Sequence, residues 1–165
     1  MIVLIMGVAG AGKSTVAARL ATDLGWRYVE ADAFHDPSCI ARMAAGGALT
    51  DADRWPWLER VIAACRREER AGGNVVLACS ALKAAYRHVL GEGDGLHVVY
   101  LRAQPGLVRD RVATRRGHFA PVALVDSQFT DLEEPGSACP ESMCVVPADW
   151  PVERIVSRVR TRFGI

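Results

Sequence analysis

The sequence predicts an α/β fold in which a parallel sheet is covered by helices on both faces. Apolar, β-branched runs alternate with segments of helical periodicity along the whole chain, the pattern of strands joined by crossover helices. One run, Val75 to Cys79, is apolar without interruption, as expected of a strand buried on both faces. At 165 residues the chain is long enough for one domain with a sizeable core.

Each element follows from periodicity and from glycine or proline at its ends. We expect five strands, at 1–6, 26–31, 74–79, 96–101 and 143–146. We expect helices at 13–24, 38–46, 53–71, 81–90, 105–116, 121–132 and 151–163. Two segments, about 33–57 and about 115–121, are predicted to be excursions from the sheet.

Composition narrows the class of protein. The formal net charge of +1 gives no case for nucleic-acid or membrane affinity. No apolar run reaches the roughly 20 residues of a membrane span, and the apolar start leads directly into a glycine-rich loop, unlike a signal peptide. The five cysteines are odd in number and include no C-x-x-C pair. We therefore expect a reduced, cytoplasmic protein without a zinc site or a disulfide framework.

The stretch from Gly7 to Ser14 fits the phosphate-binding pattern G-x-x-x-x-G-K-[ST]. An apolar strand precedes it, and helical spacing of Val16 and Leu20 follows it. Glycines let backbone N–H groups approach phosphate oxygens, and the helix N-terminus adds partial positive charge. Lys13 can reach the β- and γ-phosphates, and Ser14 offers a hydroxyl to Mg²⁺. The pattern predicts a nucleoside triphosphate site, the alternative being an ordinary glycine-rich turn before a helix.

The rest of the chain favours a kinase over other phosphate-loop classes. The third strand ends Ala78-Cys79-Ser80 without the carboxylate expected of a motor or transport ATPase, and no Asn-Lys-x-Asp motif of a GTPase occurs. A carboxylate instead ends the second strand, at Asp32. Ligands of open parallel sheets bind at the carboxyl ends of the strands, so Asp32 is expected to face the loop. There it could orient an acceptor hydroxyl, accept its proton or hold Mg²⁺ through water, unless it only caps a helix.

Three groups of cations are expected near the same edge of the sheet. Arg54 lies in a cluster of acids and tryptophans, and its planar guanidinium suits a carboxylate or a phosphate. Trp57, in the same cluster, is expected to pack in the core. Ser80 would cap a helix on which Lys83 and Arg87 share one face, either as ligands or as a solvated basic surface.

The third group lies near the end of the helix at 105–116. Arg111, Arg115 and Arg116 run into Gly117-His118-Phe119. The helix dipole alone favours cations at this end. Alternatively, these arginines belong to a small lid that closes over the triphosphate, neutralises developing charge and excludes water.

These residues resemble the gluconokinases of the small, nucleoside-monophosphate-kinase-like type. The resemblance covers nearly the whole chain in order. It rests on Met6 to Ser14, Asp32-Ala33-Phe34-His35, Arg42-Met43, Leu49 to Leu58, Cys79 to Lys83, Tyr86-Arg87, Arg115 to Phe119, Ser127-Gln128-Phe129 and Leu132 to Pro135. The phosphate loop alone is shared with many families, whereas the Asp-x-Asp-Arg and Cys-Ser-Ala-Leu-Lys elements are far more specific.

The resemblance implies Mg²⁺-dependent transfer of the γ-phosphoryl group of ATP to the 6-hydroxyl of D-gluconate, by a homodimer of three-layer αβα domains with a five-stranded parallel sheet. By position it implies a triphosphate site of Gly7, Val8, Ala9, Gly10, Ala11, Gly12, Lys13, Ser14 and Thr15, with Ser14 on Mg²⁺. It implies Asp32 as base, and Arg111 and Arg115 as a lid pair. It implies acceptor contacts from His35, Arg54, Lys83 and Arg87, with Ser80 and His118 beside them.

The sequence departs from the family pattern around the acceptor. Ala31, Asp36, Cys39, Arg42 and Ala48 stand where glycine, proline, asparagine, lysine and proline are usual. Two other hypotheses therefore stay open. One is a kinase for another small acceptor, such as shikimate or a nucleoside monophosphate, and the other is a nucleotide-binding regulator without transfer activity.

Overall fold

The structure is a computed structural model that describes residues 1–91, 95–114, 122–135 and 142–165. Five parallel strands form one sheet in the order β2-β3-β1-β4-β5. The strands are β1 (Ile2–Met6), β2 (Arg27–Glu30), β3 (Val75–Ala78), β4 (Leu96–Arg102) and β5 (Met143–Pro147). The predicted α/β class with a five-stranded parallel sheet is confirmed.

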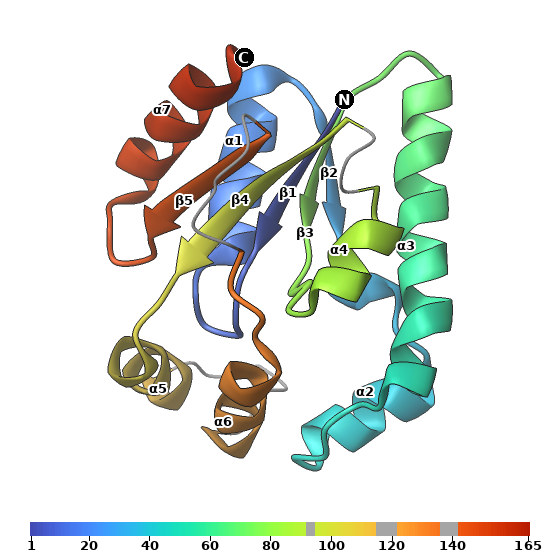
Figure 1. The fold of residues 1–165 in the computed structure, drawn as a ribbon, viewed down its shortest axis with the longest axis vertical. Helices are drawn as coiled ribbons and strands as arrows, with labels where there is room; N and C mark the ends of the chain where they lie inside the picture. Colours follow the sequence, from blue (N-terminus) through green and yellow to red (C-terminus); the bar gives the residue numbers. More distant parts are fainter. Residues whose placement is uncertain (92–94, 115–121, 136–141) are drawn as a thin grey trace.

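Helices cover both faces of the sheet, so the domain has three layers (Figure 1). One face carries α1 (Lys13–Leu24) and α7 (Val152–Phe163), and the other carries α3 (Asp51–Arg70) and α4 (Ala84–Val89). Three more helices lie beyond the carboxyl ends of the strands: α2 (Pro37–Ala44), α5 (Pro105–Thr114) and α6 (Val122–Asp131). These three helices therefore surround the carboxyl edge of the sheet (Figure 1).

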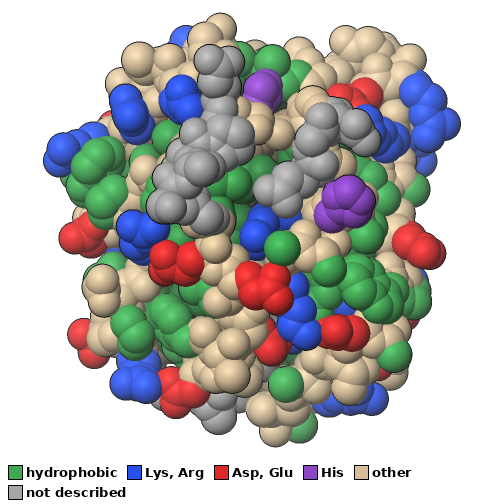
Figure 2. All heavy atoms as spheres, in the orientation of Figure 1, with side chains coloured by type: hydrophobic (Ala, Val, Ile, Leu, Met, Phe, Trp, Pro, Cys, Tyr) green, Lys and Arg blue, Asp and Glu red, His purple; other side chains and the backbone are tan. Residues whose placement is uncertain are grey.

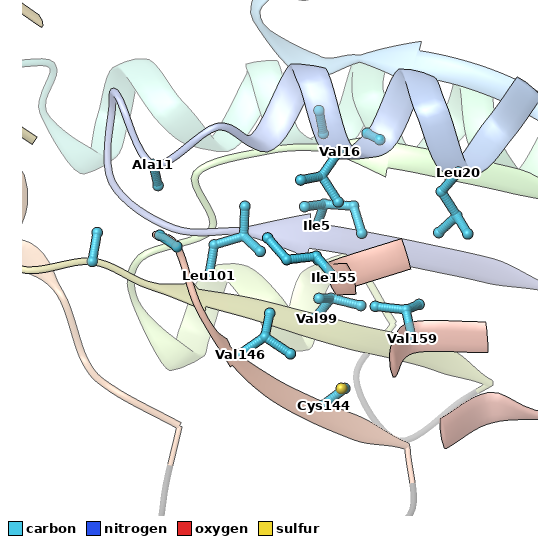
Figure 3. Packing of buried hydrophobic residues seen from close by; sticks show 14 of the residues in the cluster. Ile5, Ala11, Val16, Leu20, Val99, Leu101, Cys144, Val146, Ile155 and Val159 are labelled. Atoms are coloured by element: carbon cyan, nitrogen blue, oxygen red, sulfur yellow. The ribbon is translucent and has the colours of Figure 1, made fainter. Parts of the chain in front are cut away.

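The core consists of two apolar clusters, one on each face of the sheet. Figure 3 shows the first, in which Val16 and Leu20 of α1 and Ile155 and Val159 of α7 pack on strand residues such as Ile5. The second packs Trp57, Leu58 and Val61 of α3 against the opposite strand face. Strands buried on both faces explain the uninterrupted apolar runs in the sequence.

The structure differs from the sequence prediction in three local details. A short 3₁₀ helix, η1 (Ala31–Phe34), directly follows β2 and was not predicted. Helix α3 begins earlier than expected, capped by Thr50 in a reciprocal capping box with Asp53. Helix α4 begins at Ala84, because Ala81 adopts a left-handed φ of 43° that a helix cannot include, so Ser80 is not its cap.

Charged side chains of both signs lie on the surface (Figure 2). On the face shown in Figure 2, basic and acidic side chains are interspersed. Within the described parts of the chain, no helix has both the length and the apolar character needed to cross a membrane.

Candidate active site

The loop between β1 and α1 has a shape that only glycine permits at two positions. Gly7 has φ +145°, and a Cβ there would lie 2.9 Å from the carbonyl oxygen of Leu101. Gly10 has φ +79°, and a Cβ there would lie 3.0 Å from Cγ2 of Val112. Both the dihedral angles and the neighbouring atoms therefore exclude side chains. The motif glycines fit the loop closely between the end of β4 and helix α5.

The start of α1 is suited to an anion. Gly12 is its N-cap and has no side chain to bond the first N–H groups, and the first turn carries no acidic residue. These N–H groups and the helix dipole are therefore directed at any ligand above the loop. The Lys13 ammonium folds back over the loop and donates to the carbonyl oxygen of Val8 at 3.1 Å.

Arg111 joins helix α5 to this loop. Its Nη1 lies 3.5 Å from the carbonyl oxygen of Gly10 and 3.4 Å from that of Ala11, and its Nη2 donates to Ala148 at 3.1 Å. The structure thus places a predicted nucleotide-binding arginine against the phosphate loop. Arg115 and His118, the other residues assigned to the predicted lid at 115–121, lie outside the described residues.

A pocket of about 430 Å³ opens beside the loop. It brings together six side chains that the sequence singled out: Lys13, Ser14, Asp32, His35, Arg54 and Ser80. The other described lining residues are Ala9, Gly10, Gly12, Ala33, Ile40, Met43, Leu49, Trp57, Leu82, Val112 and Gln128. Charged groups thus surround a partly apolar volume, next to a phosphate-binding loop.

Asp32 and His35 enter the pocket from η1 and the residue after it. The Asp32 side chain is 68% exposed, and its Oδ1 lies 3.9 Å from Nε2 of His35. The His35 ring is 4% exposed and stacks on Trp57 with 4.3 Å between centroids. Burial lowers the pKa of His35, and the nearby charge of Asp32 opposes this shift. The imidazole is therefore neutral at pH 7, beside a carboxylate open to the pocket.

Arg54 is the cation that α3 contributes to the lining. Its side chain is 13% exposed. Its Nη1 donates to the hydroxyl of Tyr86 and to Oδ2 of Asp131, both at 3.0 Å. The guanidinium is thus fixed between α4 and α6 while still facing the pocket.

Lys83 and Arg87 are not among the described residues that line the pocket. Lys83 pairs with Asp51 at 2.8 Å. Arg87 is 4% exposed, and its Nη1 donates to the carbonyl oxygens of Ala81, Leu82 and Glu133 at 3.2–3.3 Å. These two cations form neither the expected solvated basic surface nor a shared helix face. Arg87 supports the turn that carries Ser80 into the pocket.

Gln128 is a pocket residue to which the sequence reasoning assigned no role. Its Oε1 accepts a hydrogen bond from the backbone N–H of Ala9, in the phosphate loop, at 2.6 Å. A signal was present in the sequence: Val125, Gln128, Phe129 and Leu132 share one helix face, and Gln128 is the polar member. A polar residue on an otherwise apolar inward face indicates a specific buried partner.

Two other features carry no comparable chemistry. A wider hollow of about 510 Å³ lies between α1 and α7, but Arg19 there is paired with Asp23 and Glu153. Cys79 is close to the pocket, yet burial raises the pKa of its thiol to about 12, so it is protonated and unreactive at neutral pH.

A five-stranded parallel sheet whose central strand leads through this loop into a helix, with the pocket described above, defines a phosphate-loop kinase. The family model described as "AAA domain" matches residues 2–135. A gluconokinase of Gluconobacter oxydans is 47% identical over 134 residues, which cover 80% of this chain and 75% of that protein.

Two solved structures are similar over almost the whole chain. A sugar kinase from Janibacter superposes with a TM-score of 0.91 at 39% identity, covering 99% of this chain and 94% of that one. A gluconokinase from Sinorhizobium meliloti superposes with a TM-score of 0.84 at 35% identity, covering 98% and 90%. The chain belongs to the gluconokinase family, and it is a kinase.

Proposed function

We propose that this enzyme transfers the γ-phosphoryl group of ATP to the 6-hydroxyl of D-gluconate. The observation that carries the proposal is the set of charged side chains lining one pocket. Lys13 lies on the phosphate loop, Asp32 stands open beside it, and Arg54 faces the same volume. A phosphate loop, a general base and a carboxylate-binding guanidinium are what a hydroxy-acid kinase requires.

The donor side fits ATP. The glycine cradle, the uncapped start of α1 and the Lys13 ammonium provide N–H groups and positive charge where a triphosphate would bind. Mg²⁺ would be held by the Ser14 hydroxyl, and it would supply positive charge to the phosphates. Thr15 and Arg111 complete the proposed nucleotide site. Arg115 stays a predicted lid residue.

Asp32 is proposed to start the reaction as general base. Its carboxylate takes the proton of the 6-hydroxyl while that oxygen forms a bond to the γ-phosphorus. The bond from phosphorus to the bridging oxygen breaks, and ADP leaves with the electron pair. Lys13 stabilises the charge that develops on the transferred group. The neutral His35 and the hydroxyl of Ser80 line the same pocket and are suited to hydroxyl groups of the acceptor.

Arg54 is proposed to bind the carboxylate of the acid. A guanidinium can bond a carboxylate with two parallel N–H donors, which a neutral polyol cannot match. In this proposal Lys83 and Arg87 do not contact the acid. Lys83 holds the start of α4 against α3 through Asp51, and Arg87 stabilises the turn that carries Ser80. His118 stays a predicted acceptor residue.

The departures from the family pattern do not reach the pocket. Asp36 pairs with Arg60 at 2.9 Å, and Arg42 pairs with Asp53 at 2.6 Å. Cys39 is buried, and none of these side chains is among the described lining residues. Repulsion of an acidic acceptor such as gluconate by Asp36 is therefore not expected.

An acceptor screen tests this proposal. ADP release is measured with ATP, Mg²⁺ and each of D-gluconate, shikimate and nucleoside monophosphates, ranked by kcat/KM. We expect D-gluconate to rank first. No gluconate-dependent turnover at millimolar concentration would overturn the proposal, and tight ATP binding without turnover on any acceptor would favour the regulator.

We also propose a cytoplasmic homodimer that uses no nucleic-acid or membrane partner. The basis is the family resemblance together with the near-neutral charge of the sequence. Light scattering coupled to size exclusion measures the assembly directly, and a mass near 17.8 kDa would indicate a monomer instead.

A further inference from the structure

One face of helix α6 contacts both sides of the pocket. Gln128 accepts a hydrogen bond from the Ala9 N–H of the phosphate loop at 2.6 Å. Asp131 accepts one from Arg54 at 3.0 Å. The two residues are three apart, so they lie on the same helix face. A single helix thus joins the nucleotide side of the pocket to the proposed carboxylate-binding arginine.

Contacts from the middle of α6 and from just beyond its C-terminal end hold the helix in position. Asp126 pairs with Arg109 of α5 at 2.6 Å. After the helix, the N–H of Glu133 donates to Leu82 at 3.0 Å, and the Glu133 carboxylate accepts from the N–H of Ala84 at 2.6 Å. A displacement of α6 would therefore be felt by α5, which packs on the phosphate loop, and by the turn that precedes α4.

The hydrogen bond to Ala9 fixes the orientation of the Gln128 carboxamide. A backbone N–H can bond only the amide oxygen, so Nε2 occupies the other position. No described group accepts a hydrogen bond from Nε2, and Gln128 lines the pocket. Its two N–H donors are therefore available to an anionic ligand.

Asp131 competes directly with an acidic acceptor. Arg54 is 13% exposed and already bonds one carboxylate, that of Asp131. A second carboxylate arriving from the pocket would share or replace this partner. Because Asp131 and Gln128 belong to one helix, a change at Arg54 would be transmitted to Ala9.

We propose that Gln128 and Asp131 are positioning residues through which α6 couples nucleotide binding to acceptor binding. The part of the proposal that concerns Asp131 and the acceptor, the acceptor arm, rests on the proposed function. The part that concerns Gln128 and nucleotide binding, the nucleotide arm, does not. The Arg54–Asp131 ion pair is intact without the acid and is weakened when the acid binds. The resulting shift of α6 changes the hydrogen bond between Gln128 and the Ala9 N–H. By thermodynamic linkage, each ligand then changes the affinity of the other by the same factor.

Calorimetry with the whole protein tests the coupling. The Kd of a non-hydrolysable ATP analogue with Mg²⁺ is measured with and without saturating D-gluconate, and the reverse titration is run. We expect a coupling factor of about fivefold or more in the wild type. Asp131→Asn and Gln128→Met should each bring it to within about twofold of unity. Thr130→Ala is the matched control, because Thr130 is exposed and, within the described residues, its hydroxyl bonds only the carbonyl of Asp126 in its own helix.

A second pair of variants separates the two functions of Gln128. Gln128→Glu keeps an acceptor for the Ala9 N–H but replaces the donors with negative charge. It should weaken analogue binding more than Gln128→Met, which should raise the Kd of the analogue alone by about fivefold, the value of one hydrogen bond. Thermal unfolding of each variant identifies any that fails to fold.

The outcomes are distinguishable. A coupling factor of unity in a wild type that binds both ligands overturns the proposal, as does an unchanged factor in both Asp131→Asn and Gln128→Met. If D-gluconate neither binds nor turns over, the proposed function fails, but the analogue Kd of Gln128→Met still decides the nucleotide arm. An unchanged Kd in that variant overturns it.

Discussion

The phosphate loop on the nucleotide side of the pocket is one contiguous stretch of backbone, whereas the acceptor side is assembled from side chains of distant segments. The loop from Gly7 to Ser14 offers N–H groups whose directions follow from the glycine dihedrals. Asp32, Arg54 and Ser80 come from three different elements and depend on their neighbours for orientation. The shape of the phosphate loop is therefore a local property of the chain, while acceptor choice is a property of the fold.

The two sides also differ in how their charges are balanced. Lys13 donates to a neutral carbonyl in its own loop. Arg54 and Lys83 are paired with the carboxylates of Asp131 and Asp51. An acidic acceptor must therefore compete with an existing ion pair at Arg54. The Asp131 carboxylate offsets the cost of removing the partly buried Arg54 guanidinium from water.

The largest expected effect is a loss of kcat when Lys13, on the nucleotide side, is replaced. Lys13→Ala should lower kcat by about 10²–10³-fold, because a preorganised charge at the transferred phosphoryl group is lost. Lys83→Ala is the matched control, since it removes a lysine from outside the pocket lining. Steady-state kinetics in both substrates measures the difference. Equal losses of kcat in the two variants would contradict the division between the sides.

Arg87→Ala should act on stability. This buried guanidinium donates to three carbonyl oxygens, and its loss should lower the free energy of unfolding by about 2–3 kcal/mol. Urea denaturation compares it with Arg66→Ala, a surface residue paired with Glu69, which should change stability by less than about 0.5 kcal/mol. A raised KM for the acid with unchanged stability would instead make Arg87 a ligand contact.

Arg54→Ala should affect the acceptor side far more than the nucleotide side. Loss of one charge-assisted hydrogen-bonded contact should raise KM for D-gluconate by about 10–100-fold, with a much smaller change in KM for ATP. Arg42→Ala is the control, because Arg42 pairs with Asp53 away from the pocket lining. If both variants raise KM equally, Arg54 has no special contact with the acid.

His35 gives the smallest expected effect, a pH dependence of stability. Burial lowers its pKa in the folded state below the ordinary value of 6.5. The unfolded chain therefore binds more protons between these two pKa values, and stability should rise with pH up to about 6.5. His35→Phe keeps the stack on Trp57 and should reduce this slope. His97, whose pKa is also lowered by burial, leaves a remaining slope in both proteins. Identical slopes would contradict the assignment.

The same contrast explains what could be predicted from the sequence. The alternation of strands and helices and the phosphate loop are local patterns, and the structure has both. Asp32 was placed at the loop because parallel strands share one carboxyl edge. The burial of Arg87 could not be predicted, because its acceptors are main-chain oxygens, one of them at Glu133. The contacts of Gln128 and Asp131 depend on how α6 packs, which no local pattern specifies.

The most direct test compares an acid with its neutral counterpart. The ratio of kcat/KM for D-gluconate to kcat/KM for D-glucitol is measured in the wild type and in Arg54→Ala. We expect the wild type to favour the acid strongly and Arg54→Ala to lower the ratio by at least about tenfold, because one charged contact to the carboxylate is lost. An unchanged ratio, or a wild type that does not phosphorylate D-gluconate, would contradict the assignment of this pocket to a sugar acid.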